Sequence, residues 1–229
     1  MRLRSALFTA LLLSACSPRV DQSAKSSIDR QIQQLRPGSE QYGAPTKSDP
    51  APLAAGQWIK QHVVDKDGND SIVTTKVLRV DGTRVWFETE TETYSGKTAL
   101  KALVSLDPAG DPKKMDVHEY WTKSAKGKVE QIPPFLLEAM KPTLRTVLAN
   151  LSAYRAIDGQ EDVSVPAGQF AQAYKGRVKI DALGKTLVSD VWWHPEVPIN
   201  GGVRAIGVDP KSTTELIAFG TSGAKSVFP

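Results

Sequence analysis

Three glutamates alternate with other residues along one predicted strand and could form an acidic pair. Glu88, Glu90 and Glu92 are separated by single residues. Because successive side chains of an extended strand point to opposite faces, all three carboxylates lie on one face. Two neighbouring carboxylates can share acid and base or nucleophile roles in a hydrolase. A solvated sheet face is the competing interpretation, and it is favoured if neighbouring strands supply Lys76 or Lys101 opposite these glutamates.

Other candidate chemistry is weak. The chain has three histidines: His62, His118 and His194. None is at metal-ligand spacing, and no second cysteine is present to complete a zinc site. A calcium loop of the EF-hand type needs glycine at its sixth position and a carboxylate at its twelfth, but counting from Asp65 these positions fall elsewhere, with Gly68 fourth and Lys76 twelfth. A hairpin turn explains that stretch better, and no nucleophile elbow, P-loop or Rossmann glycine pattern is present. We therefore expect a protein that is not an enzyme and has no cofactor or metal.

The N-terminus has the features of a secretion signal that ends at a cysteine. Arg2 and Arg4 precede a short apolar run over residues 7–13. This run is too short to cross a bilayer core of about 30 Å, which favours a signal peptide over residues 1–15. It ends in Leu13-Ser14-Ala15-Cys16, which resembles the lipobox of bacterial lipoproteins. The resemblance implies cleavage before Cys16 and attachment of diacylglycerol to its thiol; an ordinary signal peptide that happens to end near a cysteine is the alternative.

Several consequences follow from this N-terminus. Cys16 is the only cysteine, so an exported chain has no internal disulfide and must be held by its core. Ser17, in place of the aspartate that retains enterobacterial lipoproteins at the inner membrane, resembles an outer-membrane address. Acyl chains contribute about 0.8 kcal/mol per buried CH₂, so the attachment to the membrane is permanent. Cleavage removes Arg2 and Arg4 and lowers the formal charge of +4 by two, and no basic run with interleaved aromatic residues indicates nucleic-acid binding.

The segment from residue 16 to residue 54 predicts a flexible tether. It is rich in proline, serine, glutamine and lysine and poor in large apolar residues. Such a composition buries too little apolar surface to offset the entropy of ordering. Within it, Ile28, Ile32 and Leu35 recur at helical spacing, which indicates either a transient helix or a helix that binds a partner.

Residues 55–224 predict one antiparallel β domain. Apolar and polar residues alternate from Gln57 onward, and turn signals such as Asp67-Gly68-Asn69 and Asp81-Gly82 separate the strands. A helix at about 135–151 interrupts the strands, and Pro142 should kink it or divide it in two. We count roughly eight to ten strands. The predicted fold class is α+β, mainly antiparallel β: a curved sheet or incomplete β-barrel with a helical insertion packed against it.

The C-terminal third supplies a family resemblance. Val163-Ser164-Val165-Pro166-Ala167-Gly168-Gln169-Phe170 is followed by Val191-Trp192-Trp193-His194-Pro195-Glu196-Val197-Pro198. These motifs resemble the C-terminal hairpins of periplasmic proteins of the LolA/LolB type. The resemblance implies an incomplete β-barrel that holds an acyl chain in an apolar concavity under a helical lid. The residues that would line it are Trp86, Trp121, Phe135, Leu136, Met140, Leu144 and Trp192; an ordinary closed core is the alternative.

Two functions remain open at this stage. The first is an outer-membrane lipoprotein, anchored through its diacylglyceryl-cysteine, that binds a lipid or another hydrophobic ligand in its concave sheet. The second is a scaffold or accessory subunit of an outer-membrane assembly, which has an envelope protein as its partner. The hydrolase based on Glu88 and Glu90 is the least supported.

Overall fold

The computed structural model describes residues 20–49, 51–107, 114–152, 157–182 and 185–229. The predicted signal peptide and Cys16 lie outside these residues, so cleavage and lipidation stay predictions. Of the two helices in the described part, neither has the length and apolar character that crossing a bilayer requires.

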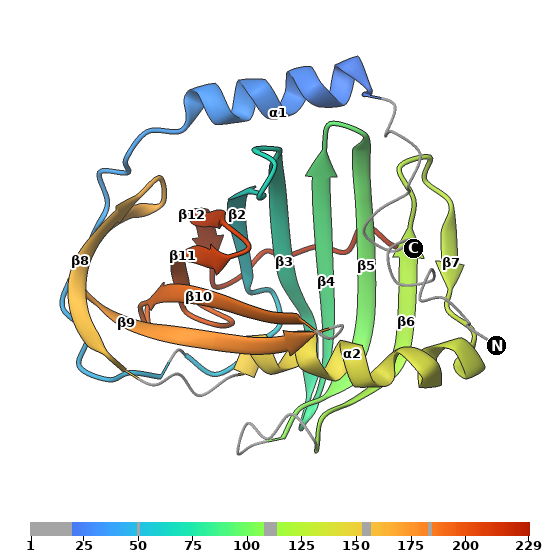
Figure 1. The fold of residues 1–229 in the computed structure, drawn as a ribbon. Helices are drawn as coiled ribbons and strands as arrows, with labels where there is room; N and C mark the ends of the chain where they lie inside the picture. The colour runs from blue at the N-terminus through green and yellow to red at the C-terminus, as the bar shows by residue number, and fades with distance from the viewer. Residues whose placement is uncertain (1–19, 50, 108–113, 153–156, 183–184) are drawn as a thin grey trace.

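One strongly curved sheet contains all the strands (Figure 1). Its strands are β1 (Gln41–Tyr42), β2 (Trp58–Val64), β3 (Asp70–Asp81), β4 (Arg84–Thr93), β5 (Gly96–Ser105), β6 (Asp116–Lys123), β7 (Val129–Gln131), β8 (Gly159–Val165), β9 (Gly168–Ala182), β10 (Lys185–Trp193), β11 (Gly202–Asp209) and β12 (Ser212–Gly220). Their order is β1-β9-β10-β11-β12-β2-β3-β4-β5-β6-β7, and β8 pairs with β9 outside this path. Every pair is antiparallel except β1 with β9.

The sheet is curved but not closed, which confirms the predicted fold class. β1 and β7 are the ends of the strand order, so no strand pairing joins them into a barrel. Tight turns with glycine in the left-handed region connect consecutive strands, as at Gly68 and Gly82. These turns set the antiparallel meander from β2 to β6 that the sequence pattern predicted.

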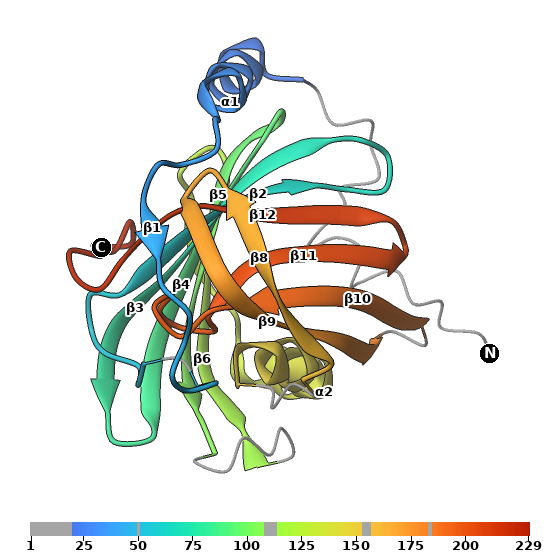
Figure 2. The same cartoon turned by 90° about the vertical axis from the view of Figure 1, so that its left-hand side faces the viewer.

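The core fills the concave side of the sheet. Val77, Phe87 and Ala102 are register partners on β3, β4 and β5, and all three are buried. The β8–β9 hairpin folds over β11 and β12 (Figure 2). It brings in Phe170, whose ring stacks on that of Tyr42 with centroids 4.3 Å apart. The chain's own side chains therefore pack the concave side.

A single helix, α2 (Pro134–Ser152), packs against β6 and β9. Its own side chains Leu137 and Met140 are buried. Asp116 of β6 accepts hydrogen bonds from Lys141 and Arg145, at 3.2 and 3.1 Å. Of the two outcomes predicted for Pro142, division of the helix is wrong, because the helix continues through the proline, and a kink stays a prediction. Packing and ion pairs on both sides of Pro142 compensate for the backbone hydrogen bond that it removes.

Part of the predicted tether is folded. A helix, α1 (Gln22–Gln34), lies across the ends of β3, β4 and β5, as Figure 1 shows. Asp21 caps its N-terminus, and Ile28 is only 1% exposed against the sheet. β1 then pairs with β9. The helical spacing of Ile28, Ile32 and Leu35 therefore belongs to a formed helix that packs on its own domain, because burial on the sheet supplies the stabilisation that composition alone does not.

Candidate functional site: the seat of the C-terminal segment

A row of large and charged side chains crosses the convex face of the sheet. The register aligns residues of five adjacent strands, β2 to β6: Trp58, Lys76, Glu88, Lys101 and Trp121. Their chain neighbours Val77, Phe87 and Ala102 point into the core. Because successive strand residues alternate between faces, the row lies on the opposite face from the core.

Residues 221–229, hereafter the C-terminal segment, run along this row. The indole of Trp58 donates to the carbonyl oxygen of Ser222 at 3.2 Å. Further along, Lys76 Nζ donates to the carbonyl oxygen of Lys225 at 2.8 Å, and Lys123 Nζ donates to that of Val227 at 2.7 Å. The segment therefore crosses from β2 to β6, as the red trace toward the C-terminus in Figure 1 shows. We call the side chains that contact this segment the seat; they are Trp58, Lys76, Glu88, Lys101 and Lys123.

Glu88 lies at the centre of the seat and is completely buried. Its carboxylate accepts from Lys76 Nζ at 2.8 Å, from the Ser226 hydroxyl at 2.7 Å and from the Val227 backbone N–H at 3.1 Å. A buried carboxylate is tolerated only when such partners replace water. The fit of the C-terminal segment is therefore tied to the charge of Glu88.

Aromatic packing completes the seat at its far end. Phe228 is 8% exposed. Lys101 Nζ lies 5.9 Å from the centroid of the Phe228 ring and 5.1 Å from that of Trp86. A lysine between two ring faces makes cation–π contacts while its stem covers apolar surface.

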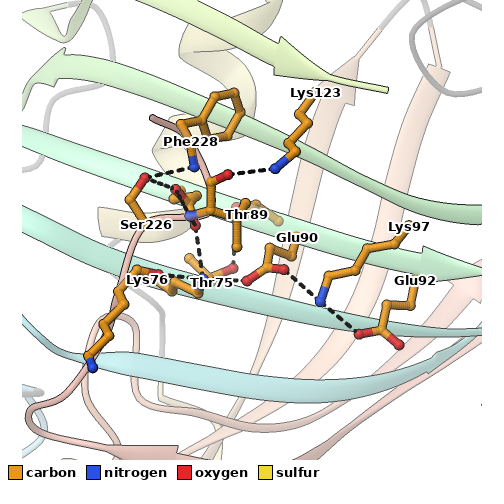
Figure 3. A network of polar contacts seen from close by, with 12 residues as sticks. Thr75, Lys76, Thr89, Glu90, Glu92, Lys97, Lys123, Ser226 and Phe228 are labelled. Carbon is orange, nitrogen blue, oxygen red and sulfur yellow. Dashed lines mark hydrogen bonds and ion pairs between the residues drawn. The ribbon is translucent and has the colours of Figure 1, made fainter. Parts of the chain in front are cut away.

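The polar contacts continue from the seat through Glu90 and Lys97 to Glu92, as Figure 3 shows, and from Glu92 to α1. Lys76 also pairs with Glu90, and Lys97 bridges Glu90 at 2.7 Å and Glu92 at 3.1 Å. Gln31 of α1 donates to Glu92 at 3.2 Å. The two terminal segments of the described chain are thus joined by one chain of ion pairs and hydrogen bonds on the same face.

These ion pairs decide the charge state of Glu90. Burial alone would raise the pKa of its carboxyl group, but the adjacent ammonium groups of Lys76 and Lys97 outweigh burial and hold that pKa below its usual value. Partial burial alone would lower the pKa of Lys97, but the carboxylates of Glu90 and Glu92 outweigh it and raise that pKa. Glu90 is therefore ionised at neutral pH and is not poised to donate a proton.

The predicted acidic pair is thus found in a structural network. Lys76 and Lys101 lie opposite Glu88 in the register, as the sequence predicted for a sheet with paired charges. The prediction of a solvated face is wrong, because Glu88 is 0% and Glu90 6% exposed. The cover comes from the C-terminal segment, which the sequence analysis did not assign to the sheet. This arrangement binds a polypeptide backbone through fixed charges.

The predicted hydrophobic lining is not brought together. Met140 and Trp192 are buried and Leu144 packs against the core. Phe135 is 78% exposed and Leu136 is half-buried at the start of α2. Trp86 and Trp121 belong to the convex face, where they are the register partners of Leu103 and Lys101. The seven residues therefore lie in three environments because alternation along the strands separates the two faces.

The remaining polar clusters do not form a metal site. Among the described residues, no three His, Cys, Asp or Glu side chains gather as they would around an ion. Asp65 accepts from the backbone N–H groups of Asp67 and Asn69, which is the predicted hairpin turn. Ser105 Oγ and His118 Nε2 lie 2.6 Å apart on neighbouring strands, an interaction that was not predicted. Only the register of β5 and β6 brings them together, so no local motif marks them.

Comparisons with known proteins do not assign the chain to a family. No protein-family model matches it, and no curated protein matches it in sequence. Among solved structures, the chain is similar to a Bacteroides fragilis protein described as a "putative exported protein with YmcC-like fold". The two are 13% identical with a TM-score of 0.39, and the match covers 76% of this chain and 100% of the other. The comparisons therefore do not support the resemblance to the LolA/LolB type, and the structural similarity is too distant to carry a functional argument.

Proposed function

We propose that this chain is a non-catalytic lipoprotein of the outer membrane that works as an accessory subunit held close to the bilayer. The observation that carries the proposal is the docking of α1 on the sheet. Only residues 17–20 separate Cys16 from Asp21, the N-cap of α1. A fully extended chain over that interval spans at most about 17 Å. An acylated Cys16 would therefore keep the domain near the membrane surface.

The proposed lack of catalytic activity is based on the burial and the ion pairs of Glu88 and Glu90. Glu88 is surrounded by donors from Lys76 and the C-terminal segment, and Glu90 is paired with two lysines. A hydrolase of the paired-acid type needs one carboxyl group that holds a proton and a route for substrate to reach it. Neither requirement fits two buried and ion-paired carboxylates.

Anchoring is tested by labelling cells with radioactive palmitate. The wild-type chain should incorporate the label and sediment with membranes, whereas Cys16→Ser should lose both properties. A Cys16→Ser chain that is still cut and membrane-held would refute the anchor.

The short distance to the membrane is tested by fluorescence quenching. A fluorophore on Ser26→Cys, an exposed position of α1, should be quenched strongly by nitroxide headgroup lipids. The matched control is Thr83→Cys, an exposed turn residue at the opposite end of β4 from the contact of Asp21 with Tyr94. Ten strand residues separate these ends by about 30 Å. Equal quenching at the two positions would contradict a domain held by docked α1.

A second candidate function is the binding of an acyl ligand beneath α2. It is favoured by the open sheet, because α2 contacts both β6 and β9 across the gap that strand pairing leaves. Movement of α2 would expose Met140 and Leu144 to a ligand. Native mass spectrometry of the protein purified from cells should then show a bound lipid. A ligand-free spectrum, together with unchanged α2 contacts after incubation with lipid, would remove this candidate.

A further inference from the structure

The seat recognises mostly features that any polypeptide has. Lys76 and Lys123 bind carbonyl oxygens of residues 225 and 227, and Glu88 binds the N–H of Val227. Two side chains add selectivity: the hydroxyl of Ser226, which donates to Glu88, and the buried ring of Phe228. The pattern that fits is therefore an extended segment with a hydroxyl residue two positions before an aromatic residue.

The seat is also built independently of its occupant. Lys76, Glu88, Lys101 and Lys123 project from long strands that pair on both sides, so they keep their places without the segment. The C-terminal segment forms no ladder with a strand and follows Gly220, where β12 ends. A Cβ built at Gly223 would meet nothing within 4 Å, but the connection is held at Gly56, which packs against Ser222 and Gly223 and accepts from the Ala224 N–H at 2.9 Å. Release of the segment would cost this hydrogen bond and the contacts with the seat, but it would break no strand pairing.

We propose that the seat is a peptide-binding site for a separate partner protein that presents an extended hydroxyl-x-aromatic segment. The C-terminal segment is then a built-in competitor. A short connection gives it an effective concentration of about 1 mM at the seat, so a partner binds only when its own segment outcompetes the tethered one. This inference does not depend on anchoring at Cys16, since every contact lies within the described domain.

The test uses the full chain and a fluorescein-labelled peptide with the sequence of residues 223–229. The host is the chain with Ser226→Ala and Phe228→Ala, in which the tethered segment is weakened but the seat is intact. Fluorescence anisotropy should show the peptide binding this host at least about tenfold more tightly than the wild-type chain. A matched peptide with alanine at the positions of Ser226 and Phe228 should lose at least about tenfold in affinity. Circular dichroism confirms that the host is folded.

A second host guards against a folding defect. It carries a Gly/Ser insertion of about 20 residues after Thr221, which lowers the effective concentration of the tethered segment and changes no seat residue. Tighter peptide binding by this host than by wild type supports the proposal. Equal binding of the wild-type and alanine peptides by a folded host overturns it. A concentration-dependent dimer of the wild-type chain that is lost with Ser226→Ala and Phe228→Ala would assign the seat to a second copy and overturn the separate partner.

Discussion

Replacement of Glu88 by glutamine should destabilise the protein by about 3 kcal/mol. If the amide oxygen takes the place of Oε1, it still accepts from Lys76 and from the Val227 N–H. The NH₂ group then takes the place of Oε2, which now accepts from the Ser226 hydroxyl and, at 3.2 Å, also from the Val227 N–H. Each hydrogen bond to a charged group contributes about 1.5–3 kcal/mol, and breaking a buried ion pair costs about 3–5 kcal/mol. Since Lys76 retains Glu90 as a second partner, the lower part of that range applies.

Urea unfolding followed by circular dichroism measures this loss. With a slope of about 2 kcal/mol per molar urea, the midpoint should fall by about 1.5 M at unchanged slope. Glu92→Gln is the matched control, because the Glu92 side chain is 24% exposed and its replacement should cost less than about 1 kcal/mol. The double replacement Lys76→Met with Glu88→Leu should recover little of the loss, because it also removes a lysine partner from buried Glu90 and leaves the Val227 N–H without its acceptor. A Glu88→Gln midpoint within about 0.3 M of the control would refute the role assigned to Glu88.

Three further outcomes are expected. Ile28→Ala removes about 2–4 kcal/mol of packing, so hydrogen exchange should show loss of protection in α1 while sheet amides stay protected; unchanged protection would contradict the docking of α1. Because the pKa of Glu90 is depressed in the folded state, its contribution is present above its unfolded pKa of about 4.3 and is lost as the pH falls through the folded value. Thermal midpoints of Glu90→Gln should therefore fall less than those of wild type on acidification from about pH 5 to about pH 3, and parallel falls would count against the ion pairs. Gly168→Ala places a Cβ 2.6 Å from the Tyr42 ring at φ +148 and should lower the thermal midpoint by several degrees, whereas Gly43→Ala, with nothing within 4 Å, should not; equal midpoints would show that β1 does not need the close approach.

The sequence was sufficient for most of the sheet. The meander of β2 to β6 was predictable because turn residues such as Asp81-Gly82, which have local conformational preferences, separate its strands. β1 and β8 were missed. β1 has two residues and exists only through pairing with the distant β9, and β8 is largely polar and exposed. Such strands depend on tertiary pairing, which local patterns do not encode.

The candidate site was half predictable. The pairing of Glu88 with lysines follows from strand alternation and register, and both are written in the local sequence. The burial of Glu88 does not, because its cover comes from Ser226 and Val227, about 140 positions away along the chain. The C-terminal segment itself has no periodicity, and Phe228, its one aromatic residue, is the signal that could have pointed to it. The error on exposure followed from this missing long-range contact.

The long separation in sequence between Glu88 and the residues that cover it has a consequence for folding. The meander from β2 to β6 joins neighbouring strands through short turns, so its contacts are local and can form early. The convex face acquires its cover only when residues 225–228 reach β3 to β6, which closes a much longer loop. Burial of Glu88 is therefore expected late in folding, after the strands that carry it have paired.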